Sequence, residues 1–340
     1  MRLVAYLERV ASRQNLSSAD ALEAMKVILS GEASQPQIAA FLAALRTKGE
    51  TADELVGFAT AMRQMAVPVD CGLKGETLLD TCGTGGDRAF TFNISTIAGF
   101  VVAGAGVHVA KHGNRSISSK CGSADLLESL GVNISMPPRE AARAIREIGI
   151  GFLFAPAIHT AMKHAQPVRV DLKIRTVFNL LGPLTNPAGA DTQLVGAPSQ
   201  HAAELMAGAL AKLGLRQGFV VHGSDGLDEI TITGPTLAYW ISGGRVEKRT
   251  LTPEDFGVPV AGPESLKGAD PQVNAAIARE VLAGAPGPRR DVVLINSAAG
   301  LVAAGRTADL KEGMRLAADS IDSGAAQARL SALAGFSPRA

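Results

Sequence analysis

The sequence predicts an α/β fold in which a small all-helical domain precedes a larger α/β domain with a mainly parallel central sheet. Up to about residue 70, apolar residues recur at three- and four-residue spacing, which is typical of amphipathic helices. From about residue 75 onward, strand-like segments alternate with helical ones, the order expected of a parallel sheet covered by helices. Pro and Gly residues collect at 67–75, where we expect the chain to cross between the domains.

Composition bounds the class of protein. The 340 residues, 46% of them hydrophobic, suffice for a large core and two domains. Lys and Arg number 33 against 32 Asp and Glu, so no summed charge favours nucleic acid or an anionic membrane, and any anion site must be local. Three cysteines without a C-x-x-C indicate reduced thiols and a cytoplasmic protein. Glu8 and Arg9 interrupt the first apolar stretch, so we expect no signal or transit peptide, and no later apolar run has membrane-spanning length.

The helices of the first domain carry start and stop signals. Three pairs have the spacing of a capping box: Ser17 with Asp20, Ser34 with Gln37, and Thr51 with Glu54. Gly31 and Gly49 stand where helices are expected to end.

The segment 78–87, LLDTCGTGGD, is the most informative stretch of the chain. Leu78 and Leu79 suit a buried strand, and the glycines that follow let the backbone turn tightly with converging N–H groups, which suits a phosphate. A plain turn is the alternative. The spacing matches neither the G-x-G-x-x-G of a dinucleotide fold nor a P-loop. Asp87 would repel a phosphate unless a cation or a ligand hydroxyl stood between them.

The remaining elements of the second domain are expected in this order: helices at 94–104, at 124–130 and from Pro138, and strands at 107–111, 152–154, 194–197 and 219–222. Residues 168–175 alternate between apolar and polar, so the period alone predicts a half-buried strand. Residues 179–187, rich in Gly and Pro, suggest a connection or hinge. After Leu251 the chain is Ala-, Gly- and Pro-rich, and we recognise no chemistry in it.

Three polar segments follow these strands, and in parallel sheets ligands gather at the carboxyl ends of strands. Residues 93–96 open a helix whose free N–H groups suit an anion, with a plain N-cap as the alternative. Residues 111–115 form either a polyanion clamp or a solvated basic loop, and Ser123 is expected to cap the next helix. Asp228 and Glu229 are either magnesium ligands or surface acids. Without an activated nucleophile, this set suits an enzyme that binds a pyrophosphate ester and takes its attacking group from a second substrate.

Together these segments resemble the anthranilate phosphoribosyltransferase family. The matches run in the family's order and spacing: GTGGD at 83–87, NIST at 93–96, KHGNR at 111–115, SSKCGSAD at 118–125, PVR at 167–169, RTVFNLLGPLTNP at 175–187 and GLDE at 226–229. The resemblance covers essentially the whole chain. Thr160, Lys173 and Cys121 depart from it, standing where Pro, Gly and Ser are common, and the first two could alter the hinge or the anthranilate tunnel.

The resemblance implies a nucleoside phosphorylase/phosphoribosyltransferase-like fold. Its helical domain would span residues 1–70 with a returning segment at about 165–190, and residues 75–164 and 191–340 would form the α/β domain. In the family the 168–175 segment belongs to the helical domain and hinge, against the strand that its period predicts. The implied reaction transfers the phosphoribosyl group of 5-phosphoribosyl 1-pyrophosphate to the amine of anthranilate, in tryptophan biosynthesis. Mg2+ and a homodimer are implied as well, with no nucleic-acid or membrane partner.

The resemblance also assigns roles by position. Phosphoribosyl pyrophosphate would be held by Gly83, Gly86, Asp87, Thr91, Asn93, Ile94, Ser95, Thr96, Lys111, His112, Gly113, Asn114, Arg115, Ser116, Ile117, Ser118, Ser119 and Ser123. Anthranilate would meet Gly83, Asn114, His159 and Arg169, whose guanidinium suits a carboxylate, and His112 would line the same tunnel. Ser95, Asp228 and Glu229 would hold magnesium, and Lys111 and Arg169 would act in catalysis.

Two alternatives remain open. A pyrimidine nucleoside phosphorylase shares the fold and cleaves a ribose anomeric bond, but the 179–187 run and the 111–115 loop favour the transferase. A paralogue that binds nucleic acid without catalysis is disfavoured by the balanced charge, by the Asp228 and Glu229 pair and by Arg169.

Overall fold

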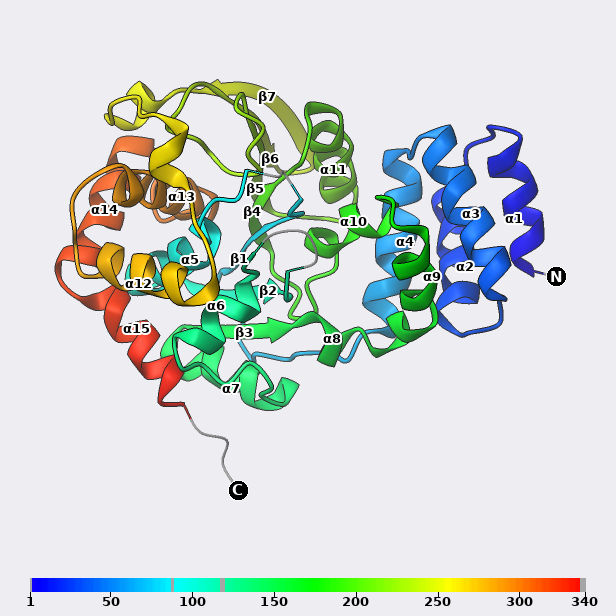
Figure 1. Ribbon diagram of the computed structural model, residues 1–340, viewed down its shortest axis with the longest axis horizontal. Helices are drawn as coiled ribbons and strands as arrows, with labels where there is room; N and C mark the ends of the chain where they lie inside the picture. Colours follow the sequence, from blue (N-terminus) through cyan, green and yellow to red (C-terminus); the bar gives the residue numbers. More distant parts are fainter. Residues whose placement is uncertain (1, 87–88, 117–119, 337–340) are drawn as a thin grey trace.

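The computed structural model describes residues 2–86, 89–116 and 120–336. Two parts lie side by side in Figure 1, a bundle of helices at the N-terminal end and a sheet covered by helices. The bundle consists of α1 (Arg2–Ala11), α2 (Ser18–Leu29), α3 (Gln35–Lys48) and α4 (Ala52–Met65). A helical bundle beside a larger α/β domain with a mostly parallel sheet confirms the predicted fold class.

The bundle helices begin at the predicted capping residues. The Ser17 side chain accepts a hydrogen bond from the backbone three residues on, and full capping boxes form at Ser34 and Thr51. Glu54, the partner in the last box, is fully buried and also accepts bonds from the Leu16 N–H and the Lys48 ammonium, both at 2.9 Å. Local capping and a buried ion pair therefore fix how α2, α3 and α4 meet.

The sheet has seven strands in the order β3-β2-β1-β4-β5-β6-β7. The strands are β1 (Leu78–Gly83), β2 (His108–Gly113), β3 (Ile150–Phe154), β4 (Thr192–Gly196), β5 (Gln217–Gly223), β6 (Thr236–Ser242) and β7 (Arg245–Leu251). From β3 to β5 neighbouring strands are parallel, and β6 and β7 are antiparallel. The first five were expected from their sequence. The β6–β7 hairpin was missed because β7 is an edge strand whose polar residues are exposed up to its last position.

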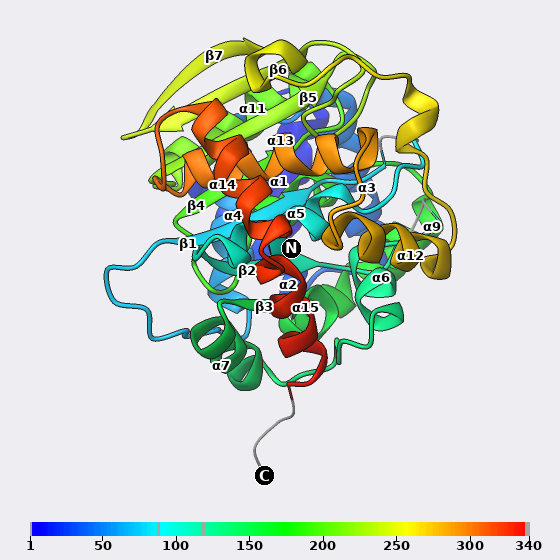
Figure 2. The same ribbon diagram turned by 90° about the vertical axis from the view of Figure 1, so that its left-hand side faces the viewer.

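Helices cover both faces of the sheet. One face packs against α5 (Ile94–Gly104), α12 (Pro271–Leu282), α13 (Pro288–Ala303), α14 (Leu310–Asp322) and α15 (Ala325–Ala334), and Figure 2 shows α14 and α15 in front of it. The other face packs against α11 (Gln200–Lys212) and α7 (Pro138–Ile148). Side chains alternate accordingly, since Leu194 enters the first core and Val195 enters a core that extends into the bundle.

The segment after β3 returns to the bundle through short helices. These are α8 (Ala155–Ile158), the 3-10 turn Thr160–His164, α9 (Gln166–Leu172), α10 (Phe178–Leu181) and the 3-10 turn Gly182–Leu184. The strand that the period predicted at 168–175 is wrong, because α9 starts with a Pro in its first turn and packs on α3. Val168 is buried, whereas Val170 and Ile174 are 58% and 49% exposed, so the alternation does not correspond to a buried face.

Strand β1 lies between β2 and β4. The chain continues from β1 to β2 and β3 on one side, and then crosses to β4 and β5 on the other side. Such a switch point leaves a crevice at the carboxyl ends of the strands, where ligands of open α/β sheets bind. Gly83 at the end of β1 pairs with Gly196 at the end of β4. The polar segments of the sequence surround this point.

Candidate active site

The Gly-rich segment passes close to the loop that carries Asp228. A side chain at Gly83 would overlap the Asp228 carboxylate, and one at Gly196 would overlap the Asp228 backbone carbonyl. Gly85 and Gly86 have φ of 65° and 75°, in the left-handed region that favours glycine. Gly196 was not among the predicted site residues, because its role depends on a contact with a loop 32 positions later in the chain.

The two acids of that loop reach both predicted phosphate segments. Asp228 Oδ2 accepts a hydrogen bond from the Gly85 N–H at 2.7 Å. Glu229 Oε1 accepts one from the Ser95 N–H at 3.3 Å, at the N-terminus of α5, where the helix dipole favours negative charge. The structure thus brings the Gly-rich loop, the start of α5 and the acid pair to one place.

These residues fit the predicted magnesium ion. Two carboxylates and the Ser95 hydroxyl are hard oxygen donors, and Mg2+ typically takes one or two carboxylates and completes its shell with water and phosphate oxygens. Throughout the described residues, no group of three or more His, Cys, Asp or Glu is placed to hold a metal. The donor set therefore suits a metal that a phosphate ligand helps to bind.

Asn93 occupies the N-cap position of α5, but its side chain makes no capping hydrogen bond. Its amide donates to the Cys121 carbonyl at 3.1 Å, and its Oδ1 accepts from the Asn274 amide at 3.0 Å. The plain N-cap considered from the sequence is therefore wrong for the side chain. Asn274 lies on α12, in the part of the chain where the sequence showed no chemistry.

Three further predicted residues lie at or just before the start of α5, and their contacts are within the protein. Ile94 is fully buried in the core and its N–H donates to the Phe92 carbonyl at 2.8 Å. Thr96 is 2% exposed, and Thr91 forms an isolated antiparallel bridge with Lys267.

Lys111 lies on β2, an interior strand of the sheet, rather than in the open loop that follows it. Its side chain is 4% exposed and its ammonium donates to the Thr81 carbonyl. It lines a small cavity of about 10 Å3 together with Thr96, Phe100 and Phe152. The charge of Lys111 therefore lies beneath the crevice, next to β1 and α5.

The loop after β2 is held by the short helix α6 (Ser123–Ser129). The Asn114 N–H donates to Ser123 Oγ at 3.2 Å, and a side chain at Gly113 would overlap that hydroxyl. Ser123 is the first residue of α6 and Gly122 is the N-cap, so the prediction that Ser123 caps this helix is wrong.

Two carboxylates of α6 hold the basic part of this loop. Arg115 donates to Asp125 at 2.8 Å and to Glu128 at 2.9 Å, and the Glu128 bond is the main reason that the pKa of Arg115 is raised. The Ser116 N–H donates to Asp125 at 3.1 Å. The Arg115 guanidinium is thus engaged within the protein. The predicted residues Asp87, Ile117, Ser118 and Ser119 lie outside the described residues.

A buried pair of histidines lies on the other side of the crevice. The rings of His112, on β2, and His159, after α8, have centroids 5.2 Å apart. Burial is the main cause that lowers the pKa of His112 to about 3 and that of His159 to about 4, so both are neutral at physiological pH. Both Nε2 atoms are buried and have no partner among the described residues. Two neutral imidazoles therefore lie side by side, each with a buried Nε2 that has no hydrogen-bond partner among the described residues.

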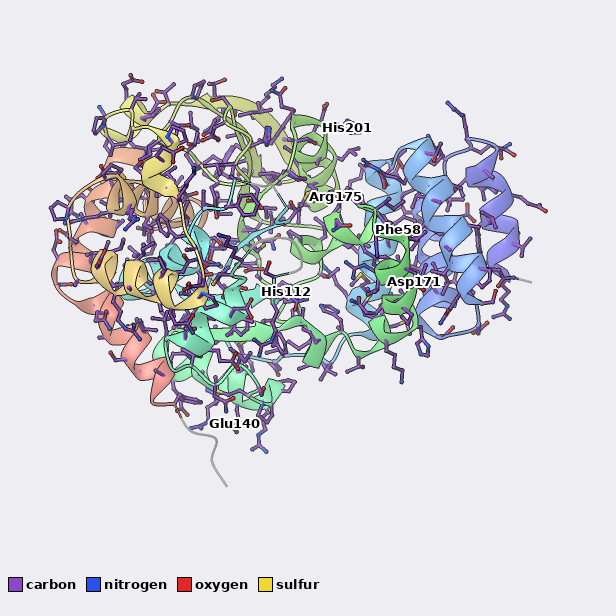
Figure 3. The ribbon with its side chains drawn as sticks, viewed as in Figure 1. Phe58, His112, Glu140, Asp171, Arg175 and His201 are labelled. Atoms are coloured by element: carbon purple, nitrogen blue, oxygen red, sulfur yellow. The ribbon has the colours of Figure 1, made fainter. Side chains whose placement is uncertain are left out.

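Two arginines of the returning segment have different surroundings: Arg169 lies beside Phe178, and Arg175 contacts the Gly-rich loop. Arg169, on α9, has its guanidinium 5.3 Å from the centroid of the Phe178 ring and donates to Gln166 at 3.3 Å, and burial lowers its pKa. Arg175 donates to the Gly86 carbonyl at 3.1 Å and to that of Gly85 at 3.2 Å. Figure 3 shows Arg175 and His112 between the sheet and α9. No role was assigned to Arg175 from the sequence, because its contacts with the Gly-rich loop form only on folding.

Comparisons with known proteins agree over the whole chain. The model of the glycosyl transferase family helical bundle domain matches residues 4–66, and that of the glycosyl transferase family a/b domain matches residues 75–327. A curated relative, anthranilate phosphoribosyltransferase of Solibacter usitatus, is 69% identical over 336 residues, 99% of each chain. That of Moorella thermoacetica is 55% identical over 331 residues, 97% of each chain.

Solved structures give the same result. Anthranilate phosphoribosyltransferase from Thermus thermophilus superposes with a TM-score of 0.92 at 45% identity, covering 97% of this chain and 98% of that one. The Saccharomyces cerevisiae enzyme in complex with PRPP and Mg superposes with a TM-score of 0.88 at 31% identity, covering 97% and 96%. The same yeast enzyme in complex with 4-fluoroanthranilate gives 0.86 at 30% identity, covering 98% and 96%.

Proposed function

The chain belongs to the anthranilate phosphoribosyltransferase family, and from that premise we propose how its own residues carry out the reaction. The reaction transfers the phosphoribosyl group of 5-phosphoribosyl 1-pyrophosphate to the amine of anthranilate, giving N-(5-phosphoribosyl)anthranilate and pyrophosphate in tryptophan biosynthesis. The observation that supports the residue roles most strongly is the meeting of Asp228 and Glu229 with the amides of Gly85 and Ser95.

Phosphoribosyl pyrophosphate would bind at the carboxyl ends of β1 and β2. The Gly83–Gly86 turn and the first turn of α5 offer backbone N–H groups, which bind phosphate oxygens without adding bulk. The loop after β2 would add Asn114 and the hydroxyls that follow it. Lys111, buried beneath these loops, contributes fixed positive charge close to where the pyrophosphate charge develops.

The acid pair and Ser95 would hold magnesium. When bound, the ion would neutralise negative charge on the pyrophosphate. Asp228 and Glu229 contribute by presenting carboxylate oxygens beside the two phosphate segments, at positions that Gly83 and Gly196 keep open. The yeast relative was solved in complex with PRPP and Mg, which supports this assignment.

Anthranilate would bind on the side of the neutral histidines. The Arg169 guanidinium suits its carboxylate, and Asn114 and Gly83 border the same space. The buried Nε2 atoms of His112 and His159 have no partner among the described residues, and an aromatic amine would offer N–H donors to them. Neutral imidazoles also add no charge that would repel the cationic anomeric carbon.

The chemical step is a displacement at the anomeric carbon. The nitrogen lone pair of anthranilate forms the new C–N bond while the C–O bond to pyrophosphate breaks, and the electron pair of the broken bond leaves with the pyrophosphate. The nitrogen, now cationic, then loses one N–H proton to water or to the departing pyrophosphate, which gives the neutral secondary amine of the product. An aromatic amine is unprotonated near neutral pH, so no strong base is needed to activate it. Holding the amine in line with the breaking bond supplies much of the rate.

Four broader assignments complete the proposal. The helical domain would comprise residues 1–70 with 165–190, supported by the packing of α9 on α3. The protein would act as a homodimer, with exposed faces of this domain as the contact surface. It would work in the cytoplasm, supported by three cysteines that are all buried free thiols. No membrane or nucleic-acid partner is proposed, and within the described part of the chain no helix is long and apolar enough to cross a membrane.

The function is tested by following anthranilate fluorescence with purified protein, phosphoribosyl pyrophosphate and magnesium, with EDTA as the control. We expect a loss of signal that needs both substrates and stops with EDTA. A flat trace from folded protein that still binds phosphoribosyl pyrophosphate would indicate a different acceptor, and no binding at all would favour the non-catalytic paralogue.

A further inference from the structure

Asn274 is a buried polar residue that reaches the active site from the C-terminal third of the chain. It lies on α12 and is 1% exposed. Its Oδ1 accepts a hydrogen bond from the Ala269 N–H at 2.8 Å, and its amide nitrogen donates to Asn93 Oδ1 at 3.0 Å. Asn274 therefore joins the segment before α12 to the first residue of the NIST motif.

Because Asn93 is the N-cap residue of α5, its bond to Asn274 affects which groups the first N–H groups of the helix can bind. An Asn at the N-cap of a helix ordinarily accepts hydrogen bonds from the N–H groups of the second or third helical residue. Those residues in α5 are Ser95 and Thr96, and the Thr96 N–H donates to the Asn93 carbonyl at 3.1 Å. The Ser95 N–H donates instead to Glu229. The Ser95 N–H is therefore the donor from which a capping Asn93 side chain would accept a hydrogen bond.

Asn274 and Cys121 together hold the Asn93 side chain away from the helix. Asn274 supplies a donor to Asn93 Oδ1, and the Cys121 carbonyl accepts from the Asn93 amide at 3.1 Å. With both ends of this side chain engaged, Oδ1 has a partner other than the helix. Asn93 has φ of −77° and ψ of 70°, and makes no side-chain capping bond.

The segment that carries Asn274 is itself fixed to the same part of the site. The Gly268 N–H donates to the Phe90 carbonyl at 2.9 Å, and the Phe92 N–H donates to the Leu266 carbonyl at 3.2 Å. A side chain at Gly268 would overlap both Phe92 and the Asn274 amide. These contacts hold the segment that carries Asn274 against the segment that carries Asn93, independently of the bond between the two side chains.

We propose that Asn274 is a positioning residue that prevents Asn93 from capping α5 and so keeps the Ser95 N–H available to a negatively charged group. In the free protein that group is Glu229, and in the complex it is a phosphate oxygen of phosphoribosyl pyrophosphate. The inference rests on the proposed function for the identity of that phosphate. It assigns a role to a residue from a part of the chain in which the sequence showed no chemistry.

The test compares Asn274→Ala with the wild type in steady-state kinetics and in thermal unfolding with and without phosphoribosyl pyrophosphate and magnesium. Freed from Asn274, Asn93 should cap α5 and compete for the Ser95 N–H. The KM for phosphoribosyl pyrophosphate should rise about tenfold, the effect of losing one hydrogen bond to a charged group, while the KM for anthranilate stays within about twofold. The rise in Tm on adding phosphoribosyl pyrophosphate should shrink.

A double-mutant cycle separates this role from general support of the fold. In an Asn93→Ala background there is no side chain to cap the helix, so adding Asn274→Ala should change the KM for phosphoribosyl pyrophosphate less than twofold. Additive losses in the two variants would overturn the proposal. Asn274→Asp retains shape and the acceptor for Ala269 but lacks the donor at neutral pH, and it should behave as Asn274→Ala does if the latter folds poorly.

Ser320→Ala is the matched control. Ser320 is buried and donates to the Val101 carbonyl at 2.7 Å, so it also bonds to α5, but toward the opposite end of the helix. It should lower Tm without changing either KM. Equal rises of both KM values in Asn274→Ala, or no change in the KM for phosphoribosyl pyrophosphate, would contradict the proposal. The thermal shift needs no turnover, so a wild type that binds but does not transfer would overturn the proposed function alone.

Discussion

The two sides of the crevice present different chemical groups. On one side, backbone amides of the Gly-rich loop and of α5 meet the carboxylates of Asp228 and Glu229. On the other side, two buried neutral histidines lie near β2 and the returning segment, their ring nitrogens without partners among the described residues. Backbone N–H groups and acids suit a magnesium pyrophosphate, whereas buried neutral imidazoles suit an aromatic amine. The difference supports the proposal that each side binds one substrate.

The largest expected effect breaks the charged side. Asp228→Asn removes a carboxylate that the Gly85 N–H and magnesium would share, and we expect kcat/KM to fall about a hundredfold, since metal stabilisation of developing charge is worth several kcal/mol. Asp191→Asn is the control, because Asp191 bonds to the Leu78 N–H at the opposite end of β1. Retention of full magnesium-dependent activity by Asp228→Asn would show that the acid pair does not hold the metal.

Gly196→Ala tests whether the position of the acid pair depends on the lack of a side chain at the end of β4. The added methyl group would overlap the Asp228 carbonyl, so the acid loop must move, and such overpacking costs about 1–3 kcal/mol. We expect a fall in Tm and a roughly tenfold rise in the KM for phosphoribosyl pyrophosphate. Gly208→Ala on α11 is the control, since its methyl group would make only an ordinary contact with Ala52 at 3.5 Å. Unchanged kinetics in Gly196→Ala would mean that the loop does not require this close approach.

The neutral side should affect the pH dependence of stability. The pKa values of about 3 and about 4 for His112 and His159 lie below the ordinary 6.5, so below pH 6.5 the unfolded chain binds more protons than the folded one, and the protein loses stability as the pH is lowered. Between pH 7 and pH 5, each histidine should remove about 2 kcal/mol of stability. Urea unfolding at both pH values should show a smaller difference for His112→Asn. An equal pH dependence in this variant would mean that folding does not lower the pKa of His112.

The smallest expected effect concerns the link between the two sides. Lys173, at the end of α9, has φ of 52°, a left-handed conformation that glycine adopts without cost. Lys173→Gly should raise the free energy of unfolding by about 0.5 kcal/mol, the relief of strain being partly offset by the greater freedom of the unfolded chain. Chemical denaturation would measure this free energy, and steady-state kinetics of the same variant should show unchanged kinetic constants. A changed KM for anthranilate would instead implicate this residue in the hinge.

The sequence predicted features that depend on neighbouring residues and missed those that depend on distant ones. The capping residues Ser17, Ser34 and Thr51 begin helices as predicted, because capping is decided within four residues. The alternation at 168–175 predicted a strand, but most of this segment belongs to the helix α9, which packs on α3.

The same limit applies within the site. Residues 83–86 and 93–96 carry local signals for a turn and a helix start, and both were recognised. Gly196, Asn274 and Arg175 carry none, since each acts on a part of the site that only folding brings to it. The acid pair was noticed from the residues alone as either magnesium ligands or surface acids, and only the family resemblance favoured the metal role and assigned a role to Arg169.

The central claim, that each side of the crevice binds one substrate, is tested most directly by measuring both KM values of Arg169→Ala. The guanidinium of Arg169 lies on the returning segment beside Phe178, and we assign it to the anthranilate carboxylate. We predict that the KM for anthranilate rises at least tenfold, as expected when a charged hydrogen bond is lost, while that for phosphoribosyl pyrophosphate changes less than twofold. Equal increases in both values would contradict the division of the site.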